Sequence, residues 1–175
     1  MKDTNLQKGF TLIEAMVAIT ILVVAVAAPL TLAAQSLFAA YYAKDQTTAF
    51  YLAQEAIEMV RNKRDTNMLS FLSGQNTGWL DNIPVGTSFW ADISNDTMVT
   101  CGATCLDSKL LHNGTFYNYQ TGSPTRFGRS VLVTQNPSLT DEAIIAVTIE
   151  WKTGSFKERS FTLETRIYNW IPDQG

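Results

Sequence analysis

The longest hydrophobic stretch of the chain lies close to its N-terminus. Residues 15–43 contain no Lys, Arg, Asp or Glu, and this stretch exceeds the about 20 apolar residues that a helix needs to cross a bilayer. The segment before Phe10, MKDTNLQKG, is short and polar and contains two lysines and one aspartate. The pattern therefore predicts an apolar N-terminal helix preceded by a short charged leader.

Three hypotheses fit this pattern. A secretory signal combines basic residues, an apolar core and a cut site of small residues, here 25–27, and gives a mature chain that starts near Ala28. A plain membrane anchor leaves the chain uncut at Met1. A pilin-type signal is cut on the cytoplasmic side, ahead of the apolar run, so that the hydrophobic helix stays in the mature protein.

Glu14, near the start of the apolar run, favours the third hypothesis. A carboxylate in a membrane helix costs up to about 2.5–3.5 kcal/mol at the bilayer centre, and neither a signal peptide nor a simple anchor benefits from that cost. A cut between Gly9 and Phe10 creates an α-amino group with a pKa close to about 8, which is largely protonated. The amine of an axially shifted neighbouring subunit would pair with Glu14. The alternative is a carboxylate that only reaches the lipid headgroups.

Beyond Ala43 the apolar run gives way to an amphipathic pattern. Apolar residues recur at three- and four-residue steps along one helical face: Ala49, Leu52, Ala53, Ala56, Ile57 and Val60. Most polar residues fall outside this stripe: Lys44, Asp45, Gln54, Glu55, Glu58 and Arg61. We expect the helix to end near Arg64, because Arg61, Lys63 and Arg64 suit the negative end of the helix dipole. Such a helix, starting at Phe10, is about 80 Å long and exceeds one compact domain.

Pro29 lies inside the apolar stretch and lacks the backbone N–H that an α-helix requires. We therefore expect a kink or a local opening of the helix at this position. Such prolines are tolerated in membrane helices where neighbouring groups satisfy the freed backbone carbonyl.

The remainder of the chain predicts a small antiparallel sheet. Residues 65–125 are rich in Asn, Ser, Thr, Gly and aromatics, which indicates loops and short strands at 88–93 and 115–119. Three later segments alternate between apolar and polar positions: 129–135, 143–151 and 156–168, the last with Phe161, Leu163, Thr165 and Ile167 on one face. A turn is expected at 152–155. One long N-terminal helix, with a membrane half and an amphipathic half, packed on this sheet makes an α+β fold.

Composition narrows the class of protein only a little. The chain is 46% hydrophobic and 17% charged, with a formal net charge of -3. A disordered protein and a binder of nucleic acid with a large basic face are therefore not expected.

The two cysteines, Cys101 and Cys105, lie close together in the sequence. A close pair in an exported chain predicts one local disulfide formed in an oxidising compartment. The bond would close a short loop, so its entropic stabilisation is small, although it would hold that segment in place. A redox-active pair is the alternative, and the spacing, which is not Cys-x-x-Cys, speaks against it.

Residues that could carry catalysis are scarce in this sequence. His112 is the one histidine, and we expect it to be a surface residue rather than a catalyst. Asp141 and Glu142 form a carboxylate pair, but their position after Pro137 and before a predicted strand indicates a solvated turn. The sequence contains no phosphate-binding loop and no metal-ligand cluster. We therefore expect a protein that is not an enzyme and holds no cofactor and no metal.

Aromatic side chains gather in the loop-rich segment: Trp79, Phe89, Trp90, Phe116, Tyr117 and Tyr119. We expect them to fill a small core that the helix alone cannot cover. The alternative is an exposed patch that contacts neighbouring subunits, a surface or DNA.

The residues around the expected cut resemble a known motif. Lys8-Gly9-Phe10-Thr11-Leu12-Ile13-Glu14, followed by AMVA, closely resembles the N-terminal motif of type IV pilins and type II secretion pseudopilins. The likeness is specific, because a small residue before an aromatic one and a Glu five residues into the mature chain must coincide with a long apolar run. Residues 52–61, LAQEAIEMVR, also resemble the second helix half of minor pilins of the pilus-modification type.

The resemblance implies processing and assembly. A membrane aspartyl prepilin peptidase would cut after Gly9, where a side chain would obstruct it, and the new N-terminus at Phe10 would be methylated. Glu14 would align subunits during assembly, and a helix-breaking residue such as Pro29 would permit filament extension. The disulfide of this family often frames a larger C-terminal loop, so no adhesive role carries over to Cys101 and Cys105.

Together these inferences predict the organisation of the chain: a leader at 1–9, a transmembrane and filament-core helix at 10–43, an amphipathic helix half at 44–66 and a globular head at 67–175. The leading hypothesis is a structural subunit, expected to be a minor one, of a type IV pilus or related filament. The alternatives are a pseudopilin of type II secretion and a membrane-anchored or secreted binding domain.

The same hypothesis predicts partners and location. The expected partners are other pilin or pseudopilin subunits, the prepilin peptidase and methylase, an assembly-platform membrane protein and, before assembly, membrane lipid. The expected location is the inner (cytoplasmic) membrane, with a single span and the head outside the cytoplasm. After assembly we expect the chain in a pilus on the cell surface or in a periplasmic pseudopilus.

Overall fold

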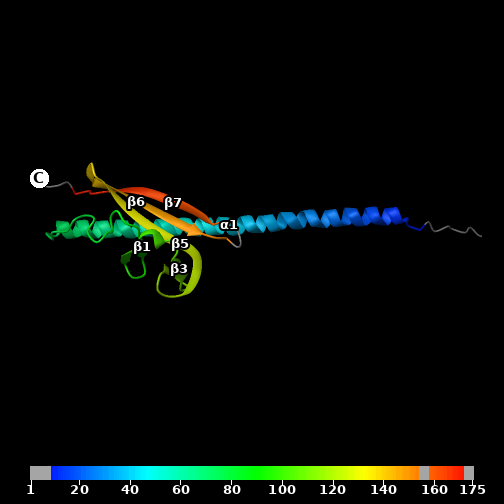
Figure 1. Ribbon diagram of the computed structural model, residues 1–175, viewed down its shortest axis with the longest axis horizontal. Coiled ribbons are helices and arrows are strands. Elements are labelled where there is room, and N and C mark those ends of the chain that lie inside the picture. Colours follow the sequence, from blue (N-terminus) through cyan, green and yellow to red (C-terminus); the bar gives the residue numbers. More distant parts are fainter. Residues whose placement is uncertain (1–8, 154–157, 172–175) are drawn as a thin grey trace, which may run out of the picture. The chain divides into compact units, whose positions relative to one another are not determined.

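Figure 1 shows the computed structural model, which describes residues 9–153 and 158–171. One long helix, α1 (Leu12–Leu72), comes first in the chain. The strands that follow are β1 (Phe89–Asp92), β2 (Thr97–Thr100), β3 (Lys109–His112), β4 (Tyr117–Asn118), β5 (Ser123–Asn136), β6 (Leu139–Trp151) and β7 (Arg159–Tyr168), with a short 3-10 helix, η1 (Gly102–Thr104), after β2. The predicted α+β fold is confirmed.

The chain divides into two compact units, Met1–Ala43 and Lys44–Gly175. Helix α1 supplies the described helical part of the first unit and the first element of the second. From here on we refer to the second unit as the head, a wider range than the head predicted at 67–175, because it includes the end of the helix. The part of α1 that lies within this unit, residues 44–72, is called the head segment of the helix.

All strand pairs in the described sheet are antiparallel, and β5 is its centre. One edge of β5 pairs with β6 from Phe127 opposite Trp151 to Asn136 opposite Leu139. Its other edge is shared between β1, which pairs at Val131, and β3. β7 pairs with β6 and forms one edge of the sheet.

The core of the head lies between the head segment of α1 and the sheet (Figure 1). The predicted apolar stripe is confirmed, since each of its six residues is buried: Ala49, Leu52, Ala53, Ala56, Ile57 and Val60. Alternate residues of β5 and β6 are buried with them: Phe127, Val131, Val133, Ala143, Ile145, Val147, Ile149 and Trp151. Each large apolar side chain removed from water in this way contributes about 1.5–3 kcal/mol.

The helix ends later than the sequence predicts, at Leu72 rather than near Arg64. Its end has the hydrogen bonds of a Schellman motif: Gln75 donates to the Ser70 carbonyl (3.1 Å) and Gly74 to the Phe71 carbonyl (2.9 Å). Gly74 has a φ of 85°, a left-handed conformation that glycine adopts without strain. The helix thus ends at a local stop signal, about two turns beyond its basic residues.

Three further details of the head correct the sequence-based expectations. Asp141 and Glu142 do not form a solvated turn: both lie in β6, and Glu142 is 7% exposed. Pro137 and Ser138 make the turn instead, between β5 and β6. Strands β2 and β3 were not expected, because neither four-residue segment shows an alternating pattern strong enough to indicate a strand.

The other strand predictions are close to the structure. The segment predicted at 88–93 contains β1, and the one at 115–119 contains the two residues of β4. In β7 the four residues predicted to share a face, Phe161, Leu163, Thr165 and Ile167, are less exposed than their neighbours. Part of the predicted turn at 152–155, and the start of the segment predicted at 156–168, lie outside the described residues.

Candidate functional site

The start of helix α1 has the hydrogen bonding of a helix cap. The backbone N–H of Glu14 donates to the Thr11 hydroxyl at 3.3 Å, so Thr11 is the N-cap and Glu14 the third helical residue. Thr11-x-x-Glu14 is the capping-box pattern, which the sequence shows and which our prediction from hydrophobicity did not use. The carboxylate of Glu14 also lies where the positive end of the helix dipole favours an anion.

Gly9 and Phe10 precede the helix and are exposed. A Cβ added at Gly9 would meet no atom within 4 Å, so packing within this chain does not require glycine there. The Phe10 side chain is 82% exposed. Within the described residues the carboxylate of Glu14 makes no ion pair. Packing within the described residues therefore places little constraint on Gly9 and Phe10, whereas Glu14 contributes to the helix start.

The first unit presents an almost entirely apolar helical surface. Its large side chains are exposed, among them Ile13, Met16, Ile19, Leu22, Val23, Val26, Leu30 and Leu37. By length and composition the helix can cross a membrane. Two of its hydroxyl groups bond within the helix, since Thr20 donates to the Met16 carbonyl (2.6 Å) and Thr31 to the Ala27 carbonyl (3.0 Å). Pro29 lies inside α1, and the kink expected there stays a prediction.

Asp45 anchors the beginning of the head segment of α1. It was expected off the buried stripe, yet it is only 7% exposed. Its Oδ2 accepts hydrogen bonds from Arg126 (2.9 Å) on β5 and from the hydroxyl of Thr153 (2.6 Å). The charge is tolerated because the Arg126 guanidinium and the hydroxyl replace the hydrogen bonds of water.

Arg129 anchors the middle of the head segment. Its side chain is fully buried on the inner face of β5, between the positions of Phe127 and Val131. It donates to the Leu52 carbonyl (3.0 Å), to the Glu55 carboxylate (3.0 Å) and to the Ala91 carbonyl. One cation thus ties together the helix, β5 and β1.

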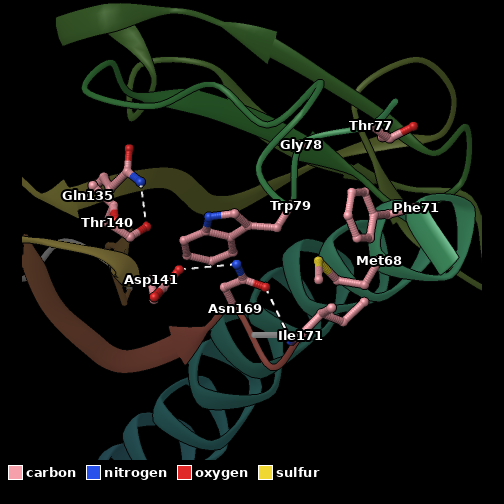
Figure 2. A pocket seen from close by; sticks show the side chains of 10 residues that line it. All are labelled: Met68, Phe71, Thr77, Gly78, Trp79, Gln135, Thr140, Asp141, Asn169 and Ile171. Atoms are coloured by element: carbon pink, nitrogen blue, oxygen red, sulfur yellow. Dashed lines mark hydrogen bonds between the residues drawn. The ribbon is translucent and has the colours of Figure 1, made fainter. Parts of the chain in front are cut away.

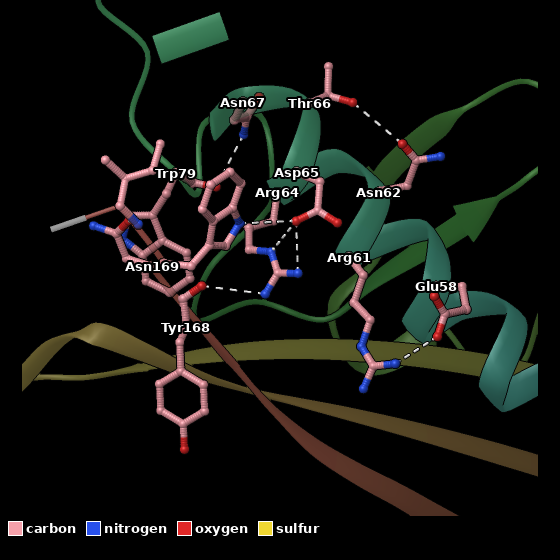
Figure 3. A network of polar contacts seen from close by, with 12 residues as sticks. Glu58, Arg61, Asn62, Arg64, Asp65, Thr66, Asn67, Trp79, Tyr168 and Asn169 are labelled. Carbon is pink, nitrogen blue, oxygen red and sulfur yellow. Dashed lines mark hydrogen bonds and ion pairs between the residues drawn. The ribbon is translucent and has the colours of Figure 1, made fainter. Parts of the chain in front are cut away.

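The last turns of α1 are tied to the C-terminal strand, as Figure 3 shows. Arg61 bonds to Glu58 (2.7 Å) and to the Thr165 hydroxyl (3.1 Å), and Arg64 donates to the Tyr168 carbonyl (3.4 Å). Asp65 accepts from Arg64 (2.8 Å) and from the Trp170 indole (3.3 Å). Two of the three basic residues expected at the helix end, Arg61 and Arg64, therefore bridge the helix to β7, and Asp65 links it to Trp170.

The expected bond between Cys101 and Cys105 is present, and it encloses η1. The Trp90 indole donates to the Cys105 carbonyl (3.3 Å) and stacks on Tyr119, with ring centroids 5.2 Å apart. Burial raises the pKa of the Tyr119 phenol above its ordinary value, and Arg129 opposes that shift. The disulfide loop is therefore held against the aromatic pair beside Arg129.

The loop-rich aromatics divide between the two expected roles. Phe89 is fully buried, and Trp79, Trp90, Tyr117 and Tyr119 are half-buried, which agrees with the expected core. Phe116 is 57% exposed and does not belong to the core.

A cleft of about 270 Å³ opens beside the end of α1 (Figure 2). It is lined by Trp79, by the apolar residues Met68 and Phe71, and by Asp141 and Asn169, whose side chains hydrogen-bond at 3.1 Å. Several of its polar groups hydrogen-bond to one another. In Figure 2 the side chain of Asn169 lies between Asp141 and Ile171. The cleft has the lining of a surface depression and brings together no nucleophile and base.

The described residues contain no group of three or more His, Cys, Asp or Glu side chains that could hold a metal ion. His112 is half-buried rather than fully at the surface, and its ring lies 4.7 Å from that of Tyr117. The predicted site residues thus fall in separate places: Gly9, Phe10 and Glu14 at the helix start, Pro29 within the first unit, and the disulfide in the head.

Comparison with known proteins bears on the N-terminal segment. Residues 4–28 match the family described as the prokaryotic N-terminal methylation motif. No curated protein and no solved structure matches the chain. The matched residues include the expected cut and Glu14, and they reach almost to Pro29. The chain therefore carries the prepilin-type motif of type IV pilins and pseudopilins, and this motif and the α+β fold together support a pilin or pseudopilin subunit.

Proposed function

We propose that this protein is a structural subunit, and a minor one, of a type IV pilus or related filament. One observation carries the proposal: a capped helix start lies directly before a long, exposed apolar helical surface, and its Glu14 makes no ion pair with any residue that the structure describes. An exposed surface of this kind needs cover from lipid or from other subunits, because apolar area in water costs about 25 cal/mol per Å². The minor role rests on the resemblance of residues 52–61 to minor pilins.

Cleavage would fall between Gly9 and Phe10, followed by methylation of the new N-terminus. The exposed backbone at Gly9, with no side chain to obstruct an active site, supports access by a prepilin peptidase. Removal of the leader also removes both leader lysines and Asp3 from the end of an otherwise apolar helix. The helix can then move from lipid into a filament core without carrying leader charges with it.

Glu14 would pair with the α-amino group of Phe10 in a neighbouring subunit. The carboxylate is exposed and makes no ion pair within the described residues, so it is available to a partner. Surrounding lipid or helices would lower the local dielectric and penalise either charge alone. This pairing fixes the axial position of one subunit against the next.

The head would lie outside the cytoplasm before assembly, with the helix spanning the inner membrane. A disulfide between Cys101 and Cys105 supports this orientation, because such bonds persist in oxidising compartments. The partners in this proposal are other pilin subunits, the prepilin peptidase and methylase, an assembly-platform membrane protein and lipid. Pro29 would supply a helix opening that permits the filament to extend.

The decisive measurement is the mass and N-terminal residue of the protein purified from its native membrane. We expect a chain that begins at methylated Phe10. A chain that begins near Ala28 would indicate an ordinary secretory signal, and an intact Met1 would indicate a plain anchor. Either result would overturn the proposal.

Substitution of Glu14 separates its two roles. Glu14→Gln keeps a residue that serves in a capping box but removes the charge, whereas Glu14→Ala removes both. If charge pairing aligns subunits, both variants are processed normally and both enter filaments poorly. Normal incorporation of Glu14→Gln would show that capping alone is needed.

A pseudopilin of type II secretion is the second candidate, since the matched motif is shared by both classes. The two differ in the filament that contains the chain. Recovery of the protein with isolated surface pili supports the first candidate, and its recovery only with the secretion apparatus supports the second.

A further inference from the structure

The hairpin loop between β3 and β4 contains the one Asn-Gly pair of the sequence, Asn113 and Gly114. Four residues, 113–116, join strands whose last paired residues are His112 and Tyr117. The loop is closed by a backbone hydrogen bond from Asn113 to the Phe116 carbonyl (3.3 Å). All four loop residues are exposed, so water reaches them freely.

The side-chain amide of Asn113 is held by two donors. Its Oδ1 accepts hydrogen bonds from the backbone N–H of Thr115 (3.0 Å) and of Phe116 (2.9 Å). Two N–H groups that converge on one carbonyl oxygen withdraw electron density from its carbon. They also stabilise the negative charge that appears on the oxygen when a nucleophile adds, which is the role of an oxyanion hole.

A candidate base, His112, and a candidate nucleophile, the backbone nitrogen of Gly114, flank Asn113 in the sequence. The backbone N–H of Gly114 donates to His112 Nδ1 at 3.3 Å, so this ring nitrogen is the acceptor that faces the Gly114 proton. The His112 ring is held in place by its packing against Tyr117. Gly114 has a φ of 98° and no side chain, and a Cβ built at this residue would meet no atom within 4 Å. His112 is thereby placed to accept the proton that the Gly114 nitrogen must lose before it can attack.

We propose that the Asn113-Gly114 loop is a self-modification site, at which the fold accelerates conversion of Asn113 to aspartate and isoaspartate. The Gly114 nitrogen bonds to Asn113 Cγ while its proton passes to His112 Nδ1. The side-chain nitrogen then takes up a proton and leaves as ammonia, which gives a five-membered succinimide. Water adds to either carbonyl of this ring and opens it, so that one oxygen enters for each nitrogen lost. No oxidant, cofactor or second protein takes part.

The head contains a matched internal comparison at Asn118. Its Oδ1 also accepts two backbone N–H groups, from Gln120 (2.8 Å) and Thr121 (2.7 Å). Asn118 differs in three ways: it is 1% exposed, its amide donates to the Thr121 carbonyl (2.9 Å), and Tyr119 follows it in place of glycine. The two donors alone therefore do not define the site, and Asn118 is expected to keep its amide.

The modification changes the charge and backbone of the hairpin. Aspartate adds one negative charge at an exposed loop, and isoaspartate also lengthens the main chain by one methylene. An aspartate at position 113 would still offer a side-chain oxygen that accepts the backbone N–H groups of Thr115 and Phe116. We therefore expect aspartate to preserve the loop and isoaspartate to loosen it.

The test uses the full-length protein in detergent, incubated at neutral pH in water enriched in heavy oxygen. Peptide mass spectrometry follows Asn113, and Asn118 and the exposed Asn95 serve as internal controls. We expect Asn113 alone to convert, with loss of ammonia and uptake of one labelled oxygen. A synthetic peptide of residues 109–119 gives the intrinsic rate of the same sequence, and we expect the folded protein to be faster by about tenfold or more.

His112→Phe tests the base while keeping an aromatic ring against Tyr117. We expect this variant to convert Asn113 about tenfold more slowly than the wild type, or slower still. Wild-type protein unfolded in urea tests the contribution of the fold without any substitution, and we expect it to match the peptide. Equal rates for peptide and folded protein, or an unchanged rate in a folded His112→Phe variant, would overturn the proposal.

Discussion

The two parts of helix α1 differ in what covers their apolar side chains. In residues 12–43 the apolar side chains are exposed, and no charged residue follows Glu14. In residues 44–72 the apolar stripe is buried against the sheet of the same chain. One continuous helix thus has a part whose apolar side chains are exposed and a part whose apolar side chains are covered by the sheet.

The two parts of α1 also differ in whether their charged side chains have partners. Asp45, Glu55 and Asp65 each have a partner elsewhere in the head, and Arg61 and Arg64 bridge to β7. In the first unit the one charged helical residue, Glu14, has no ion-pair partner within the described residues. These charged side chains of the head segment are therefore paired within the head, whereas the first unit offers Glu14 no ionic partner among the described residues.

The largest predicted effect comes from placing the same carboxylate in each part of the helix. Val60 is fully buried, and Val60→Asp would bury an unpaired charge that costs more than about 4 kcal/mol and prevents the head from folding. Val23 is 57% exposed, and Val23→Asp should leave the head folded while lowering membrane insertion. Near-ultraviolet circular dichroism in detergent measures the head, and membrane flotation measures insertion. Loss of head structure in Val23→Asp would contradict the conclusion that the head folds independently of the first unit.

The next prediction compares the contributions of Glu55 and Glu58, two carboxylates of the head segment, to the stability of the head. Glu55→Gln removes the counter-charge of the fully buried Arg129, and we expect it to lower the free energy of unfolding by about 2 kcal/mol, because a buried cation would lose its ionic partner. Glu55 is about a third exposed, which keeps the loss below that of a fully buried pair. Urea unfolding of the full chain in detergent measures the difference.

Glu58→Gln is the matched control for that variant. The Glu58 side chain is 67% exposed and pairs with Arg61 on the helix surface. Such pairs contribute about 0.3–0.5 kcal/mol, so the variant should unfold almost as the wild type does. A similar loss in both variants would show that Arg129 does not depend on Glu55.

Much of this architecture follows from sequence periodicity. The three- and four-residue spacing of the apolar stripe identifies the buried face of α1, and the alternation of residues 129–168 identifies the long strands. The motif around Gly9 and Phe10 can be recognised because it is a contiguous run of residues. Both kinds of signal are local, so one sequence suffices to find them.

What the sequence does not reveal depends on contacts between distant residues. Asp45 looks like a surface residue until Arg126, 81 positions later, folds against it. Arg129 lies two residues before Val131 and so faces the same, inner side of β5. A charged residue on the apolar side of a predicted strand is a signal, visible in the sequence, of a buried ion pair. Strands β2 and β3 likewise exist because neighbours pair with them, since their own residues carry only a weak strand pattern.

The stop signal of the helix can be tested by a substitution at Gly74. An L-residue at a φ of 85° is strained, so Gly74→Ala should lower the free energy of unfolding of the head by about 1 kcal/mol. Gly74→Asn should cost less, because asparagine tolerates this conformation. Hydrogen exchange at the last helical turn should be faster in Gly74→Asn than in the wild type, and fastest in Gly74→Ala. Equal behaviour of the two variants would place the stop elsewhere, and would weaken the case that the head segment ends at its own signal.

The smallest effect is a pH dependence carried by Tyr119 beside Arg129. Burial raises the pKa of its phenol in the folded head, so the folded state holds this proton more tightly than the unfolded state does. The resulting stabilisation is complete below the ordinary value of about 10 and is lost as the pH rises through the raised pKa.

Urea unfolding at a series of alkaline pH values, compared between the wild type and Tyr119→Phe, measures this contribution. The variant loses the hydrogen bond from the phenol to the Arg129 carbonyl (3.3 Å), which lowers its stability by a similar amount at every pH below the titration. Its stability should then fall less steeply than that of the wild type above about pH 10, because the variant has no phenol to ionise. Parallel curves would show that the folded head does not hold the Tyr119 proton. In that case the Arg129 guanidinium, which opposes the effect of burial, would dominate the electrostatics of this anchor.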